Sequence, residues 1–347
     1  MAHLLSRRHM LAAAALAPAA PFLARAQGSA TTLVENRSFI GTRSLDATGG
    51  AGGEGLRVRS NTLIRRCQFL HLGNGGVRVN VPTVNLTVEE CNAYNMYRFF
   101  EDTASVPASP AVLSNFVLRR IAAHELDHGL SRIRYYSSIG LIEDVVAHGS
   151  RQCDAYCVGF QLSGEAHHIT YRRAEAHGFQ ETGRPEGAYW NGDGFSDERG
   201  NWAIRYLSCL ATNCTDGGFD LKSAGMYLEG CIARGNKRNF RLWSSGTLQG
   251  CRSEEPVSRG GIGRPAHFSF HGEVGRRFTL VNPQVRASPG NDAPVFLIET
   301  SVPLVLEIVD ADIYAPSAPL FAIDGPEPQI IWSSSRARQR IRVARER

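Results

Sequence analysis

A short sequence pattern recurs through the middle of the chain. Each copy has a strand-like run, an apolar or Cys residue, a corner rich in His, Asn or Gly, and then Gly with two alternating apolar residues. The residue after each strand-like run is Cys67, Cys91, Ile121, Val145, Ala174, Cys209, Cys231 and Cys251, with spacings of 24, 30, 24, 29, 35, 22 and 20. Strands this short cannot bury a face alone, so successive coils must stack. The repeat therefore predicts an all-β solenoid of about ten coils.

Most of the cysteines fall on this repeated position. Five of the eight cysteines occupy it, at residues 67, 91, 209, 231 and 251. Free cysteine packs as a small apolar side chain, so we expect an inward ladder of thiols rather than a set of disulfides. Neighbouring ladder cysteines would still lie near bridging distance. Cys153, Cys157 and Cys214 lie off the ladder, and the repeat assigns them no role.

The start of the chain is typical of an export signal. Ser6-Arg7-Arg8 gives a twin-arginine start, an Ala-rich apolar run follows, and Ala24-Arg25-Ala26 supplies a small-x-small cleavage pattern. The apolar run is too short to span a membrane, and no other segment is long and apolar enough. We therefore expect a twin-arginine signal peptide over residues 1–26, one solenoid domain over residues 27–335, and a periplasmic or secreted protein.

The formal charge of the chain comes from its two ends. The whole chain carries +5, of which residues 1–26 contribute three Arg and the tail over residues 336–347 contributes six Arg and one Glu. Removing those contributions of +3 and +5 leaves the body at −3, which gives no reason to expect a nucleic-acid partner. An Arg-rich tail of this kind is typical of a solvated chain end.

The most conspicuous metal motif is the run from His124 to His128, which matches H-E-x-x-H. That spacing binds zinc when it lies on a helix, because the two His side chains then share one face. Here the motif falls at a coil corner, shortly after the ladder residue Ile121, so we expect no zinc site. Cys153-x-x-x-Cys157 lacks the second pair of ligands that a structural metal site needs.

Two Asp-Gly corners flank a strand-like run within residues 191–220. They are Asp193-Gly194-Phe195 and the run from Asp216 to Asp220. Side chains alternate along a strand, so aligning G-F-S, G-F-D-L and N-F-R-L places Phe195, Phe219 and Phe240 inside the solenoid. Ser196, Asp220 and Arg241 would then stand side by side outside. Asp193 and Asp216 fall close to Asp220 in the same alignment.

Three carboxylates this close would repel one another, which favours a hard cation among oxygen ligands. We therefore expect Ca²⁺ at Asp193, Asp216 and Asp220, with Arg241 and Lys222 beside it. The aromatic residues Tyr189, Trp190 and Trp243 are expected on the same outward face, where aromatic rings pack on sugar rings. The alternative is that Asp220 and Arg241 form a simple cross-coil ion pair and the Asp-Gly pairs are only turns.

The repeat resembles the right-handed parallel β-helix of pectate-lyase-like proteins, and its corners resemble those of the family nine polysaccharide lyases. That family has a D-G-F corner, a D-D-G-W-D corner on the next coil and a later G-F-K-L strand. Asp193 matches the first corner, and Asp216 and Asp220 match the outer acids of the second. Gly217 replaces the middle Asp, and Arg241 stands where the family has its Lys.

The resemblance implies β-elimination on a polysaccharide that contains uronic acids. In the family, the Asp residues bind calcium and the Lys abstracts a proton. Calcium would neutralise the uronate carboxylate and make the adjacent C5 proton more acidic. Arg241 is then the expected base, with Lys222 as its rival.

The sequence therefore predicts a calcium-dependent lyase that acts on an acidic polysaccharide. One alternative is a non-catalytic β-helix protein that binds or guides an exopolysaccharide. A glycoside hydrolase or a uronate epimerase on the same fold is another. A hydrolase needs two carboxyl groups at a suitable separation, whereas the acids here are expected to surround one ion.

Overall fold

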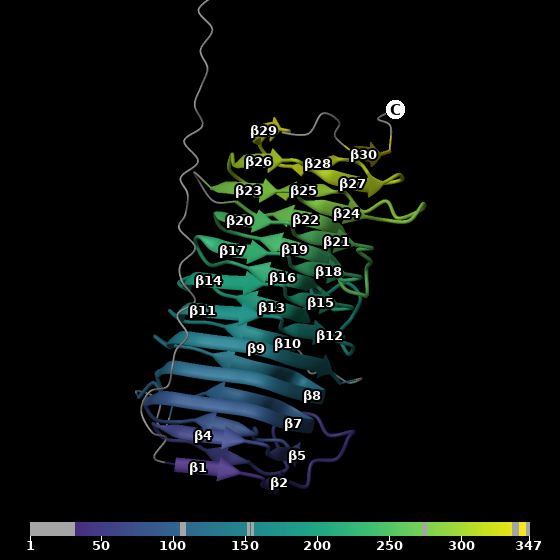
Figure 1. Ribbon diagram of the computed structural model, residues 1–347. Helices are drawn as coiled ribbons and strands as arrows, with labels where there is room; N and C mark the ends of the chain where they lie inside the picture. The colour runs from purple at the N-terminus through teal and green to yellow at the C-terminus, as the bar shows by residue number, and fades with distance from the viewer. Residues whose placement is uncertain are drawn as a thin grey trace, which may run out of the picture.

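The chain winds as a column of parallel strands from the N-terminal coil to the C-terminal coil, in a computed structural model (Figure 1). The structure describes residues 32–104, 109–150, 153, 156–272, 276–334 and 340–344. Within these residues there are strands and no helix, and they form a parallel β-solenoid of about 11 turns. The predicted all-β parallel solenoid is confirmed. The expected signal peptide lies outside the described residues.

The strands form three stacks that run along the column, and all pairings between coils are parallel. The first stack contains β1 (Thr32–Glu35), β4 (Thr62–Arg65), β11 (His167–Arg172), β14 (Trp202–Leu207), β17 (Met226–Glu229), β20 (Gly246–Gln249), β23 (Arg277–Val281), β26 (Val305–Val309) and β29 (Gln329–Ser333). The second contains β2 (Ser38–Ile40), β5 (Gln68–Leu72), β12 (Glu175–His177), β15 (Leu210–Thr212), β18 (Ile232–Arg234), β21 (Arg252–Glu254), β24 (Gln284–Arg286), β27 (Asp312–Ala315) and β30 (Arg340–Val343).

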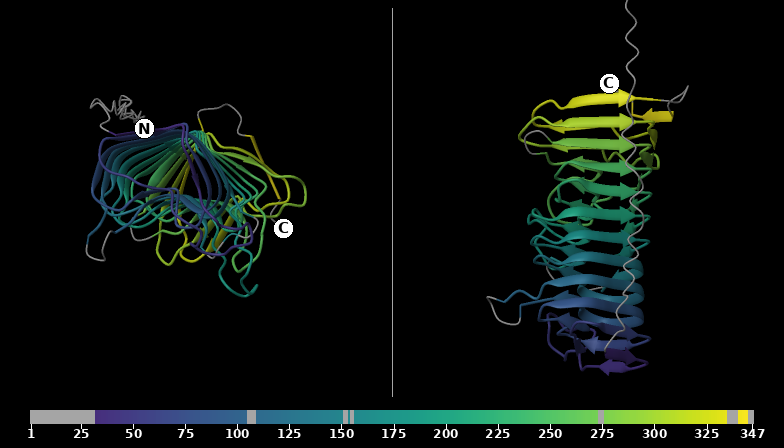
Figure 2. Two further views of the ribbon diagram at one scale, coloured as in Figure 1. Left: turned by 90° about the horizontal axis from the view of Figure 1, so that it is seen from below. Right: turned by 60° about the vertical axis from the view of Figure 1, so that its left-hand side comes forward.

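The third stack carries the candidate site. It contains β3 (Leu56–Arg57), β6 (Val77–Val79), β10 (Val158–Leu162), β13 (Asp193–Asp197), β16 (Gly217–Leu221), β19 (Arg238–Leu242), β22 (Ala266–Phe270), β25 (Phe296–Glu299) and β28 (Phe321–Asp324). The long strands β7 (Thr83–Asp102), β8 (Leu113–Ile133) and β9 (Ser138–Gly149) pass through more than one stack. Figure 2 shows the coils from below, where the superposed strands outline the faces of the solenoid.

A residue with left-handed backbone geometry turns the chain between the first and second stacks in successive coils. These residues are Asn36, Arg66, Glu90, Arg120, Asp144, Arg173, Ser208, Gly230, Gly250, Asn282 and Asp310. The ladder residue follows this corner directly and points inward. Cys91 lies beside Ile121, which lies beside Val145, so the predicted ladder is confirmed in these coils. All eight cysteines are buried free thiols, as expected for small apolar packing.

A column of stacked Phe rings fills the solenoid behind the third stack. Ring centroids lie 4.8 Å apart from Phe160 to Phe195 and from Phe195 to Phe219, then 5.2 Å to Phe240 and 5.0 Å to Phe268. Each ring fixes the position of its strand relative to the next coil. The inward Phe column therefore also fixes which outward residues lie side by side.

The HELDH motif lies within strand β8 and not on a helix. Asp127 forms a buried ion pair with Arg43, which ties the segment that follows β2 to the column. His124 stacks on His148 with ring centroids 4.6 Å apart, whereas His128 stacks on Tyr97 at 4.7 Å. The two His side chains therefore pack against different partners.

The C-terminal tail differs from the expectation of a solvated end after residue 335. Arg340–Val343 form β30, which pairs with β27 and so extends the second stack. The alternating Arg-Ile-Arg-Val pattern explains this, because Ile341 and Val343 pack against the hydrophobic core. Among the described residues, no helix has the length and apolar character needed to cross a membrane.

Candidate functional site

The predicted outward row of residues is present on the third stack. Ser196 on β13 pairs with Asp220 on β16, and Asp220 pairs with Arg241 on β19. The same register sets Phe195, Phe219 and Phe240 behind them. The strand alignment drawn from G-F-S, G-F-D-L and N-F-R-L is therefore confirmed.

A cleft of about 440 Å³ opens over this row. Six of the predicted site residues line it, and they are Tyr189, Asp193, Asp220, Lys222, Arg241 and Trp243. Asp216 lies just beneath, 1% exposed, where it contacts both Tyr189 and Arg241. The cleft thus brings together the acids, the cations and two of the three aromatic residues that the sequence singled out.

Arg241 is the central cation of the cleft. Its Nη1 donates to Asp216 Oδ2 at 2.7 Å and to Tyr189 Oη at 3.2 Å, and its Nε lies 3.8 Å from Asp220 Oδ1. Burial by itself would lower the pKa of Arg241, but the attraction of Asp220 and Asp216 outweighs burial and raises it. The guanidinium therefore keeps its proton, which does not suit the predicted role of Arg241 as a base.

Lys222 is the second cation and is held by two carboxylates. Its Nζ lies 2.7 Å from Glu198 Oε1 and 3.2 Å from Asp220 Oδ2. Burial favours the neutral amine, but Asp220 and Glu198 outweigh it and raise the pKa of Lys222. Lys222 therefore suits the binding of an anion better than the abstraction of a proton.

Two neighbouring carboxyl groups have pKa values that move in opposite directions. Asp193 is 1% exposed, and its Oδ1 accepts a hydrogen bond from the Gly217 N–H at 2.7 Å. Burial, followed by repulsion from Asp220 and Asp216, raises the pKa of Asp193 well above its usual value. Burial also opposes ionisation of Asp220, but Arg241 and Lys222 overcome it and lower the pKa of that carboxyl.

Gly217 lies between these two carboxyl groups, where there is no room for a side chain. A Cβ at this position would lie 2.8 Å from Asp193 Oδ1 and 3.0 Å from Asp220 Cβ, both closer than ordinary van der Waals contact. The middle Asp of the family pattern would therefore need the neighbouring acids to move. The absence of a side chain at residue 217 therefore allows the buried acids to pack closely.

Tyr189 reaches the cleft from the loop that precedes β13. Its hydroxyl donates to Asp216 Oδ2 at 2.6 Å and accepts from Arg241 Nη1 at 3.2 Å. Burial, together with the negative charges of Asp216 and Asp193, raises the pKa of Tyr189. The hydroxyl is thus a neutral donor that lies between a carboxylate and a guanidinium.

The other two predicted aromatic residues differ in their placement. Trp243 lines the cleft, donates from Nε1 to Asp220 Oδ1 at 2.6 Å and stacks on His271 with ring centroids 4.1 Å apart. Trp190 instead packs against Gly260 and Gly261 of a following loop, where a Cβ would lie 2.5 Å and 2.6 Å from its ring. Trp190 therefore joins two loops and does not contribute to the surface of the cleft.

The predicted calcium ligands do not form a site that fits Ca²⁺. Asp216 and Asp220 face Arg241 and Lys222, whose positive charges would repel a cation, and Asp193 accepts a backbone N–H. Within the residues described, no group of three or more His, Cys, Asp or Glu side chains could hold a metal ion. Ca²⁺ would need both cations to leave before the carboxylates could turn toward it.

The sequence interpretation missed two residues that contact the site. Glu198 pairs with Lys222, and His271 lies within 3.4 Å of Arg241 Nε through its Nε2. Glu198 directly follows Asp197, whose partner Leu221 directly precedes Lys222, so the strand register alone would have placed Glu198 beside Lys222. Both residues lie just after a strand of the third stack, at the same corner as Trp243.

The comparisons with known proteins identify the fold. No protein-family model matches the chain, and no curated protein matches it. The A-module of a mannuronan C-5 epimerase from Azotobacter vinelandii superposes with a TM-score of 0.50 at 14% identity, covering 88% of this chain and 91% of that chain. An endo-xylogalacturonan hydrolase from Aspergillus tubingensis gives 0.45 at 9% identity, covering 91% of each chain.

A surface adhesin of Streptococcus pneumoniae gives a TM-score of 0.46 at 8% identity, covering 90% of this chain and 84% of that chain. At such low identity, the likeness to the epimerase module shows a shared fold alone. It agrees with the parallel β-helix described above. None of the comparisons places the chain in family nine of the polysaccharide lyases.

Proposed function

We propose that the protein cleaves a polysaccharide that contains uronic acids, by β-elimination in the cleft over β13, β16 and β19. The observation that carries the proposal is the position of Arg241, which lines the cleft between the Tyr189 hydroxyl and two carboxylates. A guanidinium binds a carboxylate through paired hydrogen bonds and stabilises the negative charge that develops on it during the reaction. Lys222 supplies a second cation for the same group.

Proton transfer is assigned to the neutral groups that surround this cation. Tyr189 takes the C5 proton of the uronate while its own hydroxyl proton passes to Asp216 Oδ2, which lies 2.6 Å away. The C4–C5 double bond forms as the C4–O4 bond breaks. Asp193, whose pKa is raised by burial and by repulsion from Asp220 and Asp216, gives a proton to the departing O4. Arg241 and Lys222 thus serve as charge stabilisers and not as the base.

A second candidate is hydrolysis of the same polysaccharide. The observation that favours it is the opposite pKa shift of Asp193 and Asp220, since such pairs supply the acid and the base of glycoside hydrolases. Asp193 would again protonate the leaving oxygen, and Asp220 would activate water. The two candidates differ in their products, because only elimination leaves an unsaturated sugar.

The deciding experiment incubates the full chain with polygalacturonate, alginate and other acidic polysaccharides. Elimination raises both the ultraviolet absorbance of the unsaturated uronyl product and the number of reducing ends. Hydrolysis raises the reducing ends alone. Binding without either signal on any uronate polymer would refute cleavage and support the alternative of a non-catalytic binding protein.

A chelator arm of the same assay tests the calcium expectation. The proposed steps use no metal, so activity should survive the chelator and should not rise when Ca²⁺ is returned. Loss of activity that Ca²⁺ restores would instead support the metal site expected from the family pattern. We also infer export of the protein from its first 26 residues, which fractionation of the producing cells tests.

A further inference from the structure

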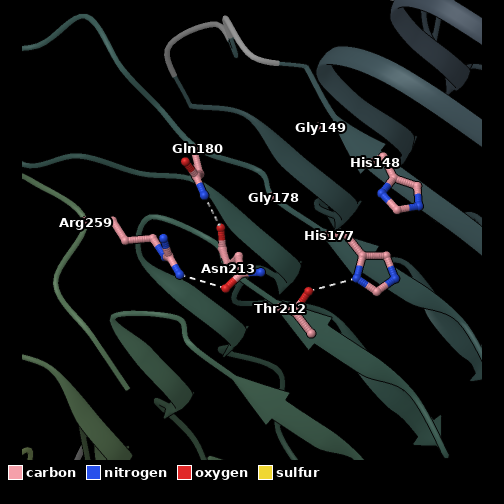
Figure 3. A pocket seen from close by; sticks show the side chains of 8 residues that line it. All are labelled: His148, Gly149, His177, Gly178, Gln180, Thr212, Asn213 and Arg259. Carbon is pink, nitrogen blue, oxygen red and sulfur yellow. Dashed lines mark hydrogen bonds between the residues drawn. The ribbon is translucent and has the colours of Figure 1, made fainter. Parts of the chain in front are cut away.

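A second hollow of about 540 Å³ lies on the column next to the corner between β15 and β16. His148, His177 and Thr212 occupy matching positions in three successive coils on one side of it. Arg259 and Gln180 lie on the other side, around Asn213, as Figure 3 shows. The volume falls within the range of small-molecule sites.

Two glycines, Gly149 and Gly178, are among the residues that line this hollow. Gly178 has a φ of +65°, and a Cβ placed there would meet no atom within 4 Å. A side chain at this position would therefore project into open space. The glycine satisfies the left-handed corner and also lets a ligand approach the chain closely.

Arg259 is oriented by neutral oxygen atoms. Its Nε donates to the Gly235 carbonyl at 2.8 Å, and its Nη2 donates to Asn213 Oδ1 at 2.7 Å. Asn213 is itself held, because its carbonyl accepts from Gln180 Nε2 at 2.8 Å. The guanidinium is thus fixed in place, and these hydrogen bonds leave its charge without compensation by a carboxylate.

The opposite wall presents two imidazole rings. His148 and His177 stack with ring centroids 4.7 Å apart, and His177 Nδ1 lies 2.8 Å from Thr212 Oγ1. None of the described residues that line the hollow is acidic, and the nearest carboxylate contact is that of His177 Nε2 with Glu175 Oε2 at 3.0 Å. A fixed guanidinium facing imidazole and hydroxyl groups is suited to a sugar that carries a carboxylate.

The hollow is connected to the cleft through two paired loops. Arg259 is followed by Gly260 and Gly261, which pack on Trp190, the neighbour of Tyr189. Ile262 N–H donates to the Ala188 carbonyl at 3.0 Å, and the buried Lys237 Nζ donates to the Ile262 carbonyl at 3.1 Å. The loop that carries Arg259 therefore also supports the loop that carries Tyr189.

We propose that this hollow is a second subsite that binds a uronate residue of the same polysaccharide, with Arg259 holding the carboxylate. The proposal rests on the proposed function for its choice of ligand. A chain bound at both places gains affinity from the remote sugar, which a short oligomer cannot reach. The predicted signature is a dependence on Arg259 that appears only with long chains.

The test measures binding of galacturonate and mannuronate oligomers, a dimer and a chain of about twelve sugars, by calorimetry. Arg259→Gln should weaken binding of the long chain about tenfold, as for loss of one charge-assisted contact, and leave the dimer unaffected. The matched control is Arg264→Gln on the same loop, because Arg264 pairs with Asp324 at 2.7 Å and lies outside the hollow. The control should bind both oligomers as the unmodified protein does.

Equal binding by the Arg259→Gln protein and the unmodified protein would overturn the second subsite, as would equal weakening in the Arg264→Gln control. Failure of the unmodified protein to bind any long oligomer would overturn it as well. Product formation is measured separately in the same samples. Cleavage with no effect of Arg259 refutes only the subsite, whereas an Arg259-dependent affinity without cleavage refutes only the proposed reaction.

Discussion

Two groups of charged residues extend over several coils of this protein: a row at one corner and the cluster in the cleft. Their charges are arranged differently. At the corner between the first and second stacks of strands, the sign of the charge alternates from coil to coil. The members are Arg65 and Arg66, Glu89 and Glu90, Arg119 and Arg120, Glu143 and Asp144, and Arg172 and Arg173. Each acidic pair contacts a basic pair of a neighbouring coil, as in Arg119 to Glu89 at 2.6 Å and Arg173 to Asp144 at 2.6 Å.

The cleft breaks this alternation. Asp193 and the pair Asp216 and Asp220 lie on adjacent coils, so acidic residues are neighbours, with Lys222 just after the second of these strands and Arg241 on the next coil. These acids are buried, whereas the Arg side chains of the corner row are 30% to 50% exposed. In the corner row, each charge is paired with an opposite charge on a neighbouring coil. The cleft retains an unfavourable arrangement, and such arrangements are typical of sites that perform chemistry.

Replacing Arg241 should have the largest effect. Arg241→Met leaves Asp216 and Asp220 buried beside Asp193 without their guanidinium, so unfolding should become easier by about 3–5 kcal/mol. The loss of the charge that stabilises the transition state should lower cleavage by about 10²–10³-fold. Denaturant unfolding and the product assay measure the two effects. A protein that keeps both its stability and its cleavage would refute the role assigned to Arg241.

Asp193→Asn should separate chemistry from stability. The loss of the proton donor should lower cleavage by about 10²–10⁴-fold. The folded-state pKa of Asp193 is raised, so the stability linked to its protonation is full below the unfolded pKa and is lost as the pH rises through the folded pKa. The variant should therefore melt higher than the unmodified protein near pH 7 and about equally near pH 3. Equal melting differences at both pH values would refute the raised pKa.

Gly217→Ala tests how closely the acids are packed. The added Cβ meets Asp193 Oδ1 at 2.8 Å and Asp220 Cβ at 3.0 Å, so the free energy of unfolding should fall by about 1–3 kcal/mol. Gly183→Ala is the matched control, because a Cβ at Gly183 meets no atom within 4 Å. Similar unfolding midpoints for the two variants would show that the acids move aside easily.

Replacing a cation of the corner row should have the smallest effect. Arg119 is 39% exposed in its side chain, and Arg120 also lies within 3.4 Å of their shared partner Glu89. Arg119→Met should therefore lower the free energy of unfolding by about 1 kcal/mol or less and leave cleavage unchanged. If Arg119→Met lowered the free energy of unfolding as much as Arg241→Met does, the corner row and the cleft would not differ as described.

The sequence was sufficient to predict the register of the site because packing enforces it. A strand shifted by one residue would expose Phe195, Phe219 or Phe240, so the inward Phe column fixes Ser196, Asp220 and Arg241 as neighbours. The ladder of Cys67 to Cys251 is determined in the same way. Such regular features repeat in every coil, and the pattern of apolar residues reports them directly.

The details of charge and loop placement could not be predicted in this way. Whether Asp216 and Asp220 turn toward an ion or toward Arg241 depends on side-chain rotamers that strand register does not fix. Trp190 lies on a loop whose path depends on its contact with Gly260 and Gly261, more than 60 residues further along the chain. The strand formed by Arg340–Val343 was hidden by its high Arg content, although its apolar residues alternate.

The buried thiols give this protein a set of built-in probes of local opening. Cys67 and Cys91 lie near the N-terminal end of the column and Cys209, Cys231 and Cys251 further along it, all inside the coils. In a solenoid, each coil is stabilised mainly by its neighbours, so opening can begin at one end and proceed coil by coil. Each thiol becomes reactive only when its own coil opens. The order in which an alkylating reagent modifies these thiols therefore reports the direction in which the solenoid unfolds.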